Sequence, residues 1–249
     1  MPTPLRFFLI AFALLLSTTV RAELFLDGFL GKSFTDDADV HVQQHALGND
    51  FTVHDLAFDD ESFQSPPYYG FRAGYWLESH PWLGFGAEFF HFKIVGDTGD
   101  TRRFTGTHGG APIDVSEPVD AVVQAFKVTH GVNYLMANAY VRHGFVADDA
   151  AYPHGRVQVY GGGGLGPVIG HPENEIDHVE NHQQYELAGL GGQLLLGARF
   201  LVFRWAGLFA EYKYTLSGLD VGVRHGSADL AERTHHIIFG ITTALPTPW

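Results

Sequence analysis

The sequence predicts an all-β fold, namely an eight-stranded antiparallel transmembrane β-barrel with four long extracellular loops. Three observations lead to this prediction. Eight segments alternate apolar with small or polar residues at a period of two, which is the period of a β-strand. Long and short connections separate these segments. An export signal precedes them, and no later segment is long and apolar enough to form a membrane helix.

Residues 1–22 are predicted to be a cleaved signal peptide. Met1–Arg6 is positively charged, Phe7–Leu16 is an unbroken apolar run, and Ala22 is a small residue of the kind that signal peptidase accepts. The alternative is an uncleaved anchor, but an apolar core of roughly ten residues falls short of the ~20 that a spanning helix needs. We therefore expect residues 23–249 to form one exported outer-membrane barrel domain.

The composition is acidic and lacks cysteine. Removing the leader takes away two arginines and moves the formal charge from -13 to -15. A nucleic-acid partner would require a basic surface, so that class of function is excluded. With no Cys in the chain, disulfides, zinc fingers and thiol chemistry are excluded as well.

The first two predicted strands each have one apolar face. In Leu24–Phe34 the even-numbered positions as far as residue 30 hold leucines and a glycine, while the odd-numbered ones include Asp27. In Tyr68–Glu78, aromatic residues alternate with glycines and Arg72. Since neighbouring side chains of a strand point to opposite sides, each segment separates an apolar environment from a polar one.

The third and fourth predicted strands are Trp82–Ile94 and Ala125–Val141. In the third, apolar residues oppose glycines and Glu88. Beyond Phe90 the alternation fails, which indicates a bulge or a strand that rises above the membrane. In the fourth, the residues expected on the apolar, outward face are Phe126, Val128, Val132, Tyr134 and Met136.

The fifth and sixth predicted strands are rich in glycine. Arg156–Ile169 contains Gly161–Gly164, which could be mistaken for a phosphate-binding loop, but no helix and no Lys-Ser or Lys-Thr pair follows. Glycines inside a narrow barrel instead give neighbouring side chains room. Tyr185–Phe200 sets an apolar face that begins at Ala188 against a face made mostly of glycines.

The seventh predicted strand, Ala206–Leu216, alternates most clearly. One face is entirely apolar or aromatic, whereas Glu211 and Lys213 share the other face. The eighth, Arg233–Leu245, alternates in the same way, with isoleucines and a phenylalanine outward. An even number of strands places both chain ends on the same side of the membrane, in the periplasm.

The connections alternate in length, as they do in bacterial outer-membrane barrels, which have long outer loops and short periplasmic turns. The predicted long connections are Thr35–Pro67, Val95–Gln124, Gly170–Gln184 and Ser217–Glu232. The shorter ones are Ser79–Pro81, Arg142–Gly155 and Leu201–Arg204.

The content of the polar face decides which face points outward. A soluble, lipocalin-like barrel would bury the apolar face instead. Here the polar face is rich in glycine and carries charges of both signs, which suits the narrow, salt-bridged interior of eight strands. The residues expected to form this lumen charge network are Asp27, Arg72, Glu88, Arg199, Glu211 and Lys213. Aromatic residues expected to form interfacial girdles are Tyr69, Tyr75, Tyr134, Tyr185, Tyr212 and Tyr214.

Four motifs of the predicted strands stand out, at residues 74–78 (GYWLE), 159–166 (VYGGGGLG), 191–200 (GGQLLLGARF) and 208–215 (LFAEYKYT). In these motifs the chain resembles the small outer-membrane β-barrels of the OmpA/OmpX-like and opacity types. The resemblance implies a barrel in the outer membrane and does not specify an activity. The ending at Trp249 is similar to the aromatic-ended signal read by the barrel assembly machinery, although Pro246 and Pro248 depart from it.

The long loops are where we look for function, since a rigid scaffold presents them. Acidic residues crowd the first and third long loops, and histidines lie among them. Carboxylates with imidazoles can bind divalent cations. The spacing of His41 with His45, and of His178 with His182, would align each pair on a helix. The competing interpretation is a solvated acidic surface whose ions bridge lipopolysaccharide.

Two other functions are alternatives to this interpretation, a lipid A-modifying enzyme and a narrow channel. A lipid A-modifying enzyme needs a nucleophile with a positioned base. His235 and His236 are followed by Ile237 and Ile238, so the His-x-Ser arrangement of lipid A deacylases is absent, and both are interpreted as rim residues. His130 is interpreted as an interfacial residue. A narrow channel for small solutes is the second alternative, but a porin would need a wider ring than eight strands.

We therefore predict a non-enzymatic protein of the cell outer membrane with a structural or surface-interaction role through acidic, histidine-containing outer loops. No cofactor is expected. The expected partners are outer-membrane lipid and lipopolysaccharide, the barrel assembly machinery, and a surface ligand or divalent cations.

Overall fold

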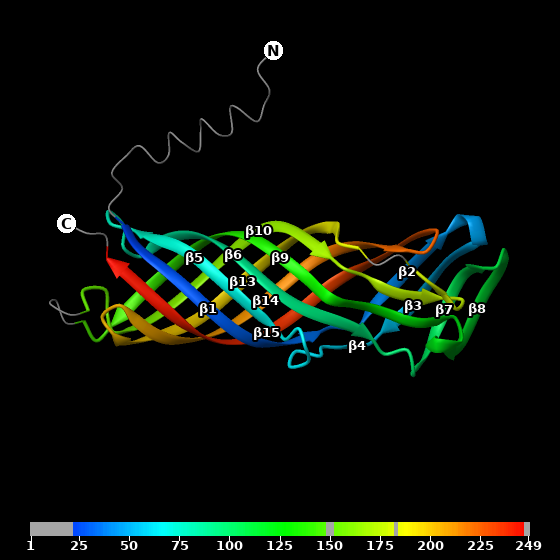
Figure 1. The fold of residues 1–249 in the computed structure, drawn as a ribbon, viewed down its shortest axis with the longest axis horizontal. Coiled ribbons are helices and arrows are strands. Elements are labelled where there is room, and N and C mark those ends of the chain that lie inside the picture. The colour runs from blue at the N-terminus through cyan, green and yellow to red at the C-terminus, as the bar shows by residue number, and fades with distance from the viewer. Residues whose placement is uncertain (1–21, 148–151, 182–183, 247–249) are drawn as a thin grey trace, which may run out of the picture.

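The computed structural model describes residues 22–147, 152–181 and 184–246 (Figure 1). The prediction of an all-β, antiparallel fold is confirmed. Most of the predicted signal peptide, residues 1–21, lies outside the described ranges, as does Trp249. Within those ranges no helix is long and apolar enough to cross a bilayer.

Eight strands pair side by side in a closed ring, which Figure 1 shows as a long cylinder. The ring closes because β1 pairs with β5 on one side and with β15 on the other, Asp27 lying opposite Arg72 and Thr242. In order around the ring the strands are β1 (Ala22–Thr35), β5 (Tyr69–Leu77), β6 (Leu83–Gly96), β9 (Val123–Phe145), β10 (Val157–Gly170), β13 (Glu186–Phe203), β14 (Ala206–Val223) and β15 (Gly226–Pro246).

The remaining elements gather at the end of the cylinder away from the chain termini (Figure 1). The sheet continues there from β15 through β2 (Ala38–Gln44) and β3 (Asn49–Leu56) to β7 (Thr101–His108) and β8 (Ala111–Pro118). Shorter elements are β4 (Phe58–Asp59), β11 (Glu173–Ile176), β12 (Val179–Glu180) and the 3-10 helices η1 (His45–Leu47) and η2 (Val119–Ala121). We call residues 36–61, 97–128, 172–181 and 218–231 the head.

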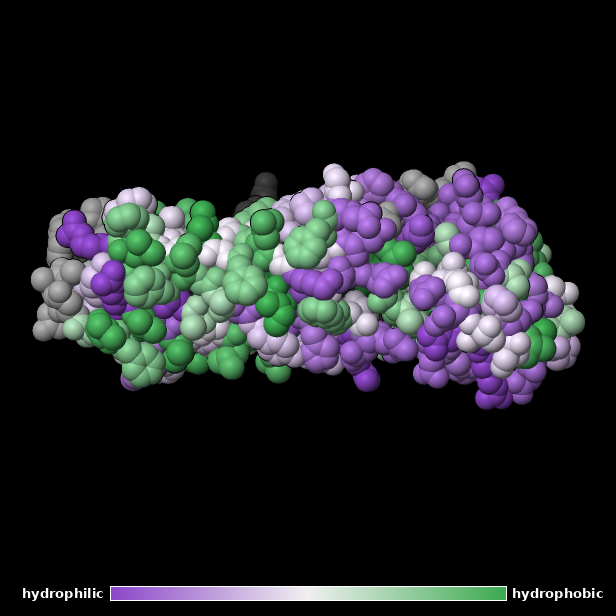
Figure 2. Space-filling model, turned by 90° about the horizontal axis from the view of Figure 1, so that it is seen from below, coloured by the Kyte–Doolittle hydropathy of each residue, from purple (hydrophilic) through white to green (hydrophobic). Residues whose placement is uncertain are grey.

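Large apolar side chains cover the outside of the ring at the terminus-bearing end, and polar residues cover the head (Figure 2). We call the exposed apolar residues of the ring the belt. They include Leu24, Leu26, Leu30, Phe71, Tyr75, Phe85, Leu135, Val141, Val159, Leu165, Leu190, Leu194, Leu196, Leu208, Tyr212, Leu216, Ile237, Phe239 and Ile241. Such a continuous surface far exceeds the apolar patches of ordinary soluble monomers.

Glycines on the inner face let large rings fill the narrow interior. A Cβ at Gly74 would lie 2.4 Å from the ring of Phe25, and one at Gly70 would lie 2.3 Å from the ring of Phe29. Gly161–Gly164 also lie within a strand, β10. Glycine in these strands therefore makes room for neighbouring groups, which is the structural interpretation that the sequence favoured over a phosphate loop.

The face predicted for the fourth strand is wrong. Phe126, Val128, Val132, Tyr134 and Met136 were expected outward, but all five are buried. From Leu135 to Val141 the odd-numbered side chains form the outer face of β9. The reason is that the upper interior of the ring is aromatic and aliphatic, so an apolar residue there gains burial by pointing inward. Tyr134 is accordingly not a girdle residue, whereas Tyr69, Tyr75, Tyr185 and Tyr212 are exposed.

The predicted long loop Ser217–Glu232 is also wrong. β14 continues to Val223, β15 begins at Gly226, and only Arg224 and His225 connect them. The two strands stay paired over the whole stretch, from Ser217 opposite Glu232 to Val223 opposite Gly226. Polar residues on the outer side of this hairpin gave the sequence its loop-like composition.

A bulge corrects a third expectation, the outward position of Ala188. This residue is buried, whereas Leu190 and Leu194 are exposed. The pairing of β10 with β13 shifts between Val168 and Ile169, and Gly189 has a φ of +156°. The predicted irregularity beyond Phe90 also exists, because the pairing of β6 with β9 shifts between Phe92 and Ile94.

Candidate functional site

The six charged residues expected in the lumen all lie inside the ring and are buried. Arg72 joins the three carboxylates of the set. Its Nη2 donates to Glu211 Oε1 at 2.8 Å and to Glu88 Oε1 at 3.3 Å, and its Nη1 donates to Asp27 Oδ2 at 3.4 Å. The four strands β1, β5, β6 and β14 thus meet through one guanidinium.

The other two cations complete the network. Lys213 Nζ donates to Glu88, and Arg199 Nη2 donates to Asp27 Oδ2 at 3.2 Å. With three acids and three bases, the set is neutral overall. Neutral groups also donate hydrogen bonds to the carboxylates. Glu88 accepts from Gln193 at 2.9 Å and from Asn138 at 3.0 Å. Glu211 accepts from Tyr160 at 2.9 Å, and Asp27 accepts from Thr242 at 2.6 Å. Paired, hydrogen-bonded charges are the form in which ions are tolerated away from water.

Aromatic layers lie on both sides of this network. Toward the termini, Phe25, Trp76 and Tyr140 pack against one another with ring centroids 5.7 to 6.2 Å apart. Toward the head, Phe90 stacks on Tyr134 at 4.9 Å and lies 4.0 Å from Lys213 Nζ. Buried side chains therefore fill the ring at three successive levels.

His236 belongs to this upper aromatic layer and is not a rim residue as predicted. It is fully buried, its ring lies 4.9 Å from that of Phe92, and its Nε2 is 2.9 Å from Thr215 Oγ1. His235, the next residue, lies on the opposite face of β15, where its Nδ1 is 2.5 Å from the Tyr212 hydroxyl. Strand alternation separates the two histidines, so they cannot act on one substrate together.

Sequence reasoning missed Glu232, a buried acid above the network. Its Oε2 accepts hydrogen bonds from Tyr134 at 2.5 Å and Ser217 at 2.9 Å, and its Oε1 accepts one from Thr215 at 3.1 Å. Glu232 was assigned to the end of a loop. The signal that would have identified it is the alternation of β15, which continues unbroken through this residue.

The outer loops are joined to one another in the head. Asn49 Nδ2 donates to Asp177 Oδ2 at 2.9 Å, and Gly109 N donates to Asn49 Oδ1 at 2.8 Å. His108 Nε2 lies 2.8 Å from Asp177 Oδ1. These contacts link the first, second and third predicted loops. The head is consequently one folded unit, and its buried apolar residues belong to a core cluster that continues into the ring; they include Val40, Val42, Phe51, Val53, Phe104, Val119, Val221 and Leu230.

His41 lies on β2 between two carboxylates. Its Nε2 is 2.8 Å from Asp50 Oδ1 and its Nδ1 is 3.2 Å from Asp229 Oδ1. The hydrogen bond to Asp50 is the main reason that the pKa of His41 is raised above its ordinary value, with Asp229 adding to the effect against a partial loss from burial. Because the two acids contact opposite ring nitrogens, they do not converge on a single ion.

The other predicted metal candidates are dispersed. His45 lies in η1 and His178 lies in the turn between β11 and β12, with Nδ1 3.7 Å from Glu175 Oε1. His182 is outside the described residues. The helical spacing proposed for His41 and His45 does not apply, because His41 lies in the strand β2 and His45 in the short 3-10 helix η1 that follows it. In the described ranges, the ligand atoms that lie close enough to share a metal ion belong to another group, His130, His171 and Glu173.

No family model and no curated protein matches the chain. Solved structures with a similar fold include Neisserial surface protein A (12% identity, 88% of this chain, 96% of that chain, TM-score 0.41). They also include OprG from Pseudomonas aeruginosa (12% identity, 91% of this chain, 97% of that chain, TM-score 0.43). A third is the outer membrane protease OmpT from Escherichia coli (8% identity, 92% of this chain, 99% of that chain, TM-score 0.46). These remote likenesses concern the fold and say nothing about activity.

Proposed function

We propose that the chain is a non-enzymatic outer-membrane β-barrel protein. Its ring of eight strands spans the membrane within the belt, and its head projects outward as a preformed interaction surface. The single observation that supports this most strongly is a change of pattern along β14, one continuous strand that passes through both regions.

Up to Leu216, β14 is apolar outside and polar inside. Leu208, Tyr212 and Leu216 are exposed, while Glu211 and Lys213 are buried. An exposed leucine row over a buried ion network is unfavourable in water, because the hydrophobic effect favours the opposite arrangement. Hydrocarbon outside the ring removes the conflict, and closure satisfies the backbone groups that lipid cannot.

Beyond Ser217 the same strand is polar outside and apolar inside. Leu219, Val221 and Val223 are buried, while Asp220 is exposed. The parity of the strand does not change, since odd-numbered residues point inward throughout. What changes is the polarity of the outer face, which is apolar up to Leu216 and polar beyond Ser217. We therefore set the outer boundary of the membrane at the level of these two residues.

The orientation follows from the chain ends. β1 begins and β15 ends at the belt end of the ring (Figure 1). Export through a cleaved leader and insertion by the barrel assembly machinery would leave this end in the periplasm and the head outside the cell. The exposed carboxylates of the head then face divalent ions, lipopolysaccharide or a surface ligand.

The filled interior argues against the channel alternative. Two aromatic layers and the neutral charge network occupy successive levels of the ring, so a solute would have to break buried ion pairs to pass. His236 and His235 are on opposite faces of their strand, and this separation argues against a shared lipid A-modifying centre at the rim.

The test is expression of the protein with and without the β7–β8 hairpin, residues 101–118, replaced by a short turn. We expect the variant to reach the outer membrane and to lose surface binding of lipopolysaccharide or cells, with planar-bilayer conductance at background in both forms. Unchanged binding would contradict the role of the head. Steady single-channel currents, or an altered lipid A mass spectrum in expressing cells, would favour the alternatives.

A further inference from the structure

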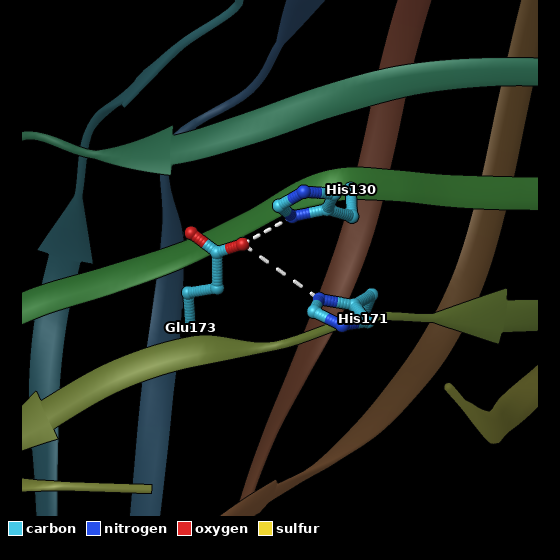
Figure 3. A group of neighbouring side chains, drawn as sticks. All are labelled: His130, His171 and Glu173. Carbon is cyan, nitrogen blue, oxygen red and sulfur yellow. Dashed lines mark hydrogen bonds and ion pairs between the residues drawn. The ribbon is translucent and has the colours of Figure 1, made fainter. Parts of the chain in front are cut away.

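We propose that His130, His171 and Glu173 form a binding site for one divalent transition-metal ion of the zinc type on the outer wall of the ring, at its junction with the head (Figure 3). The site is separate from the lumen network, and it does not depend on what the head binds. Its ligands come from β9, from the residue that follows β10, and from the start of β11.

An irregularity in β9 brings His130 to this place. In the pairing with β6, Ile94 faces Val128 and Phe92 faces Val132, so three residues of β9 stand against one residue of β6. Gly131 has a φ of +113°, a conformation that glycine adopts without strain. As a result, His130 is exposed although Val128 and Val132, at positions of the same parity, are buried.

Strand pairing brings the other two ligands alongside. β11 pairs with β9, with Glu173 opposite Lys127, and His171 lies two residues before Glu173. As Figure 3 shows, one carboxylate oxygen of Glu173 faces both imidazoles. The three side chains therefore converge because of the fold, without depending on a flexible loop.

The distances suit a shared ion. Glu173 Oε1 lies within hydrogen-bond reach of His130 Nδ1 and 3.7 Å from His171 Nδ1, and one ligand atom from each residue falls within 4.8 Å of the others. Tetrahedral zinc with bonds of about 2.0–2.1 Å sets its ligand atoms roughly 3.3 Å apart. Small side-chain rotations would bring the three atoms to that spacing.

The state of His171 is the second observation that points to a ligand. Its Nδ1 is shielded from solvent and has no hydrogen-bond partner among the described residues, since 3.7 Å to Glu173 is too long for a hydrogen bond. Tyr185 packs edge-on against the ring at 4.8 Å and holds its orientation. A metal ion would satisfy this nitrogen, because a neutral imidazole ligates through its lone pair.

The donor set selects the kind of metal. Two imidazoles and one carboxylate are ligands that zinc binds in sites that keep an open position. His130 has a side chain that is 55% exposed, which leaves the outer side of the site open for water. Calcium and magnesium prefer oxygen ligands alone, so they are poor competitors here.

Zinc binding to the folded full-length protein in detergent micelles tests the proposal. After stripping with a chelator, zinc is added in competition with a chromophoric zinc indicator, in the presence of excess magnesium. We expect one equivalent of Zn²⁺ per chain, and at least a tenfold weaker Kd in His171→Ala and in Glu173→Gln. His178→Ala is the matched control, because His178 is also paired with a glutamate but has no third ligand among the described residues. Its affinity should equal that of the unchanged protein.

Equal affinity in all four proteins, or no stoichiometric binding in the unchanged protein, would overturn the proposal. A second measurement does not depend on the variants folding. Electron paramagnetic resonance of the unchanged protein loaded with one equivalent of Cu²⁺ should show coupling to two imidazole nitrogens. A spectrum without nitrogen coupling would overturn the proposal as well.

Discussion

The belt and the head share the strands β9, β14 and β15, and the two regions have opposite inside-out arrangements. Around the belt, leucines and tyrosines face outward and ion pairs face inward. In the head, valines and phenylalanines are packed inside and aspartates are exposed. Asp220 and Leu208 lie on the same face of β14, twelve positions apart. The comparison teaches that alternation gives two faces, and that the medium around the strand determines which face is buried.

The two interiors differ in what a substitution would break. Inside the ring, buried charges stabilise one another, so removing one charge leaves its partners buried and unpaired. The head is held by apolar burial, where each group contributes separately. The following predictions use this contrast, from the largest expected effect to the smallest.

Arg72→Met should destabilise the protein by about 3–5 kcal/mol, because it leaves buried carboxylates unpaired. The matched control is Arg103→Met in the head, where an exposed pair with Asp114 is lost and the free energy of unfolding should change little. Urea unfolding in micelles, followed by tryptophan fluorescence, measures both. Similar midpoints for the two variants would show that the lumen network does not hold the ring.

Leu196→Arg places a charge on the outer face of the belt and should destabilise the protein by about 2–4 kcal/mol, because this residue pairs with Tyr212 near the middle of the membrane-spanning part of β14. Val115→Arg makes a comparable change at an exposed apolar residue of the head, where water surrounds the side chain, and should cost little. Refolding into lipid vesicles gives the two values. A tolerated arginine at position 196 would mean that hydrocarbon does not contact this face.

Val221→Ala removes two buried carbons from the core of the head and should destabilise the head by about 1.6 kcal/mol, at ~0.8 kcal/mol for each. Asp220→Ala, on the outer side of the same strand, is the control. Hydrogen exchange should show faster opening of the head in the first variant while the belt strands stay protected. Uniformly faster exchange would indicate that the two regions unfold together.

The smallest effect is expected at His41. Its pairing with Asp50 should make the free energy of unfolding depend on pH by about 0.5 kcal/mol, as for other surface pairs. Asp50 raises the pKa of folded His41 above its ordinary value of 6.5. The stabilisation is therefore complete below pH 6.5 and is lost as the pH rises through the raised value. A nuclear magnetic resonance titration measures this pKa, and Asp50→Asn should lower it. An unchanged titration in Asp50→Asn would contradict the assignment.

The sequence predicted the belt region well and the head poorly. Alternation in Ala206–Leu216 identifies both faces of β14, since the exposed apolar row and the buried ion network consist of opposite residue types. Beyond Ser217 the outer residues resemble those of a loop, so the hairpin was overlooked. Tyr134 and its neighbours on β9 were assigned outward, because residue type alone cannot distinguish lipid from an aromatic interior.

Of the candidate sites, the sequence predicted the lumen charge network but not the group of His130, His171 and Glu173. Alternation identified the lumen residues, because the in-out alternation within a single strand shows which of its residues face the interior. His171 and Glu173 are close in the sequence, but His130 meets them only through the bulge at Gly131 and the pairing of β11 with β9. Such convergence is a property of register, which a single sequence does not specify.

The most direct test of hydrocarbon outside the belt uses nitroxide spin labels at two positions of one strand. The chain has no native cysteine, so Leu208→Cys and Asp220→Cys each give a unique attachment point. In lipid bilayers the label at 208 should collide mainly with oxygen, which concentrates in hydrocarbon, and the label at 220 mainly with a water-soluble nickel chelate. Equal accessibility of the two labels to the nickel chelate would contradict the account.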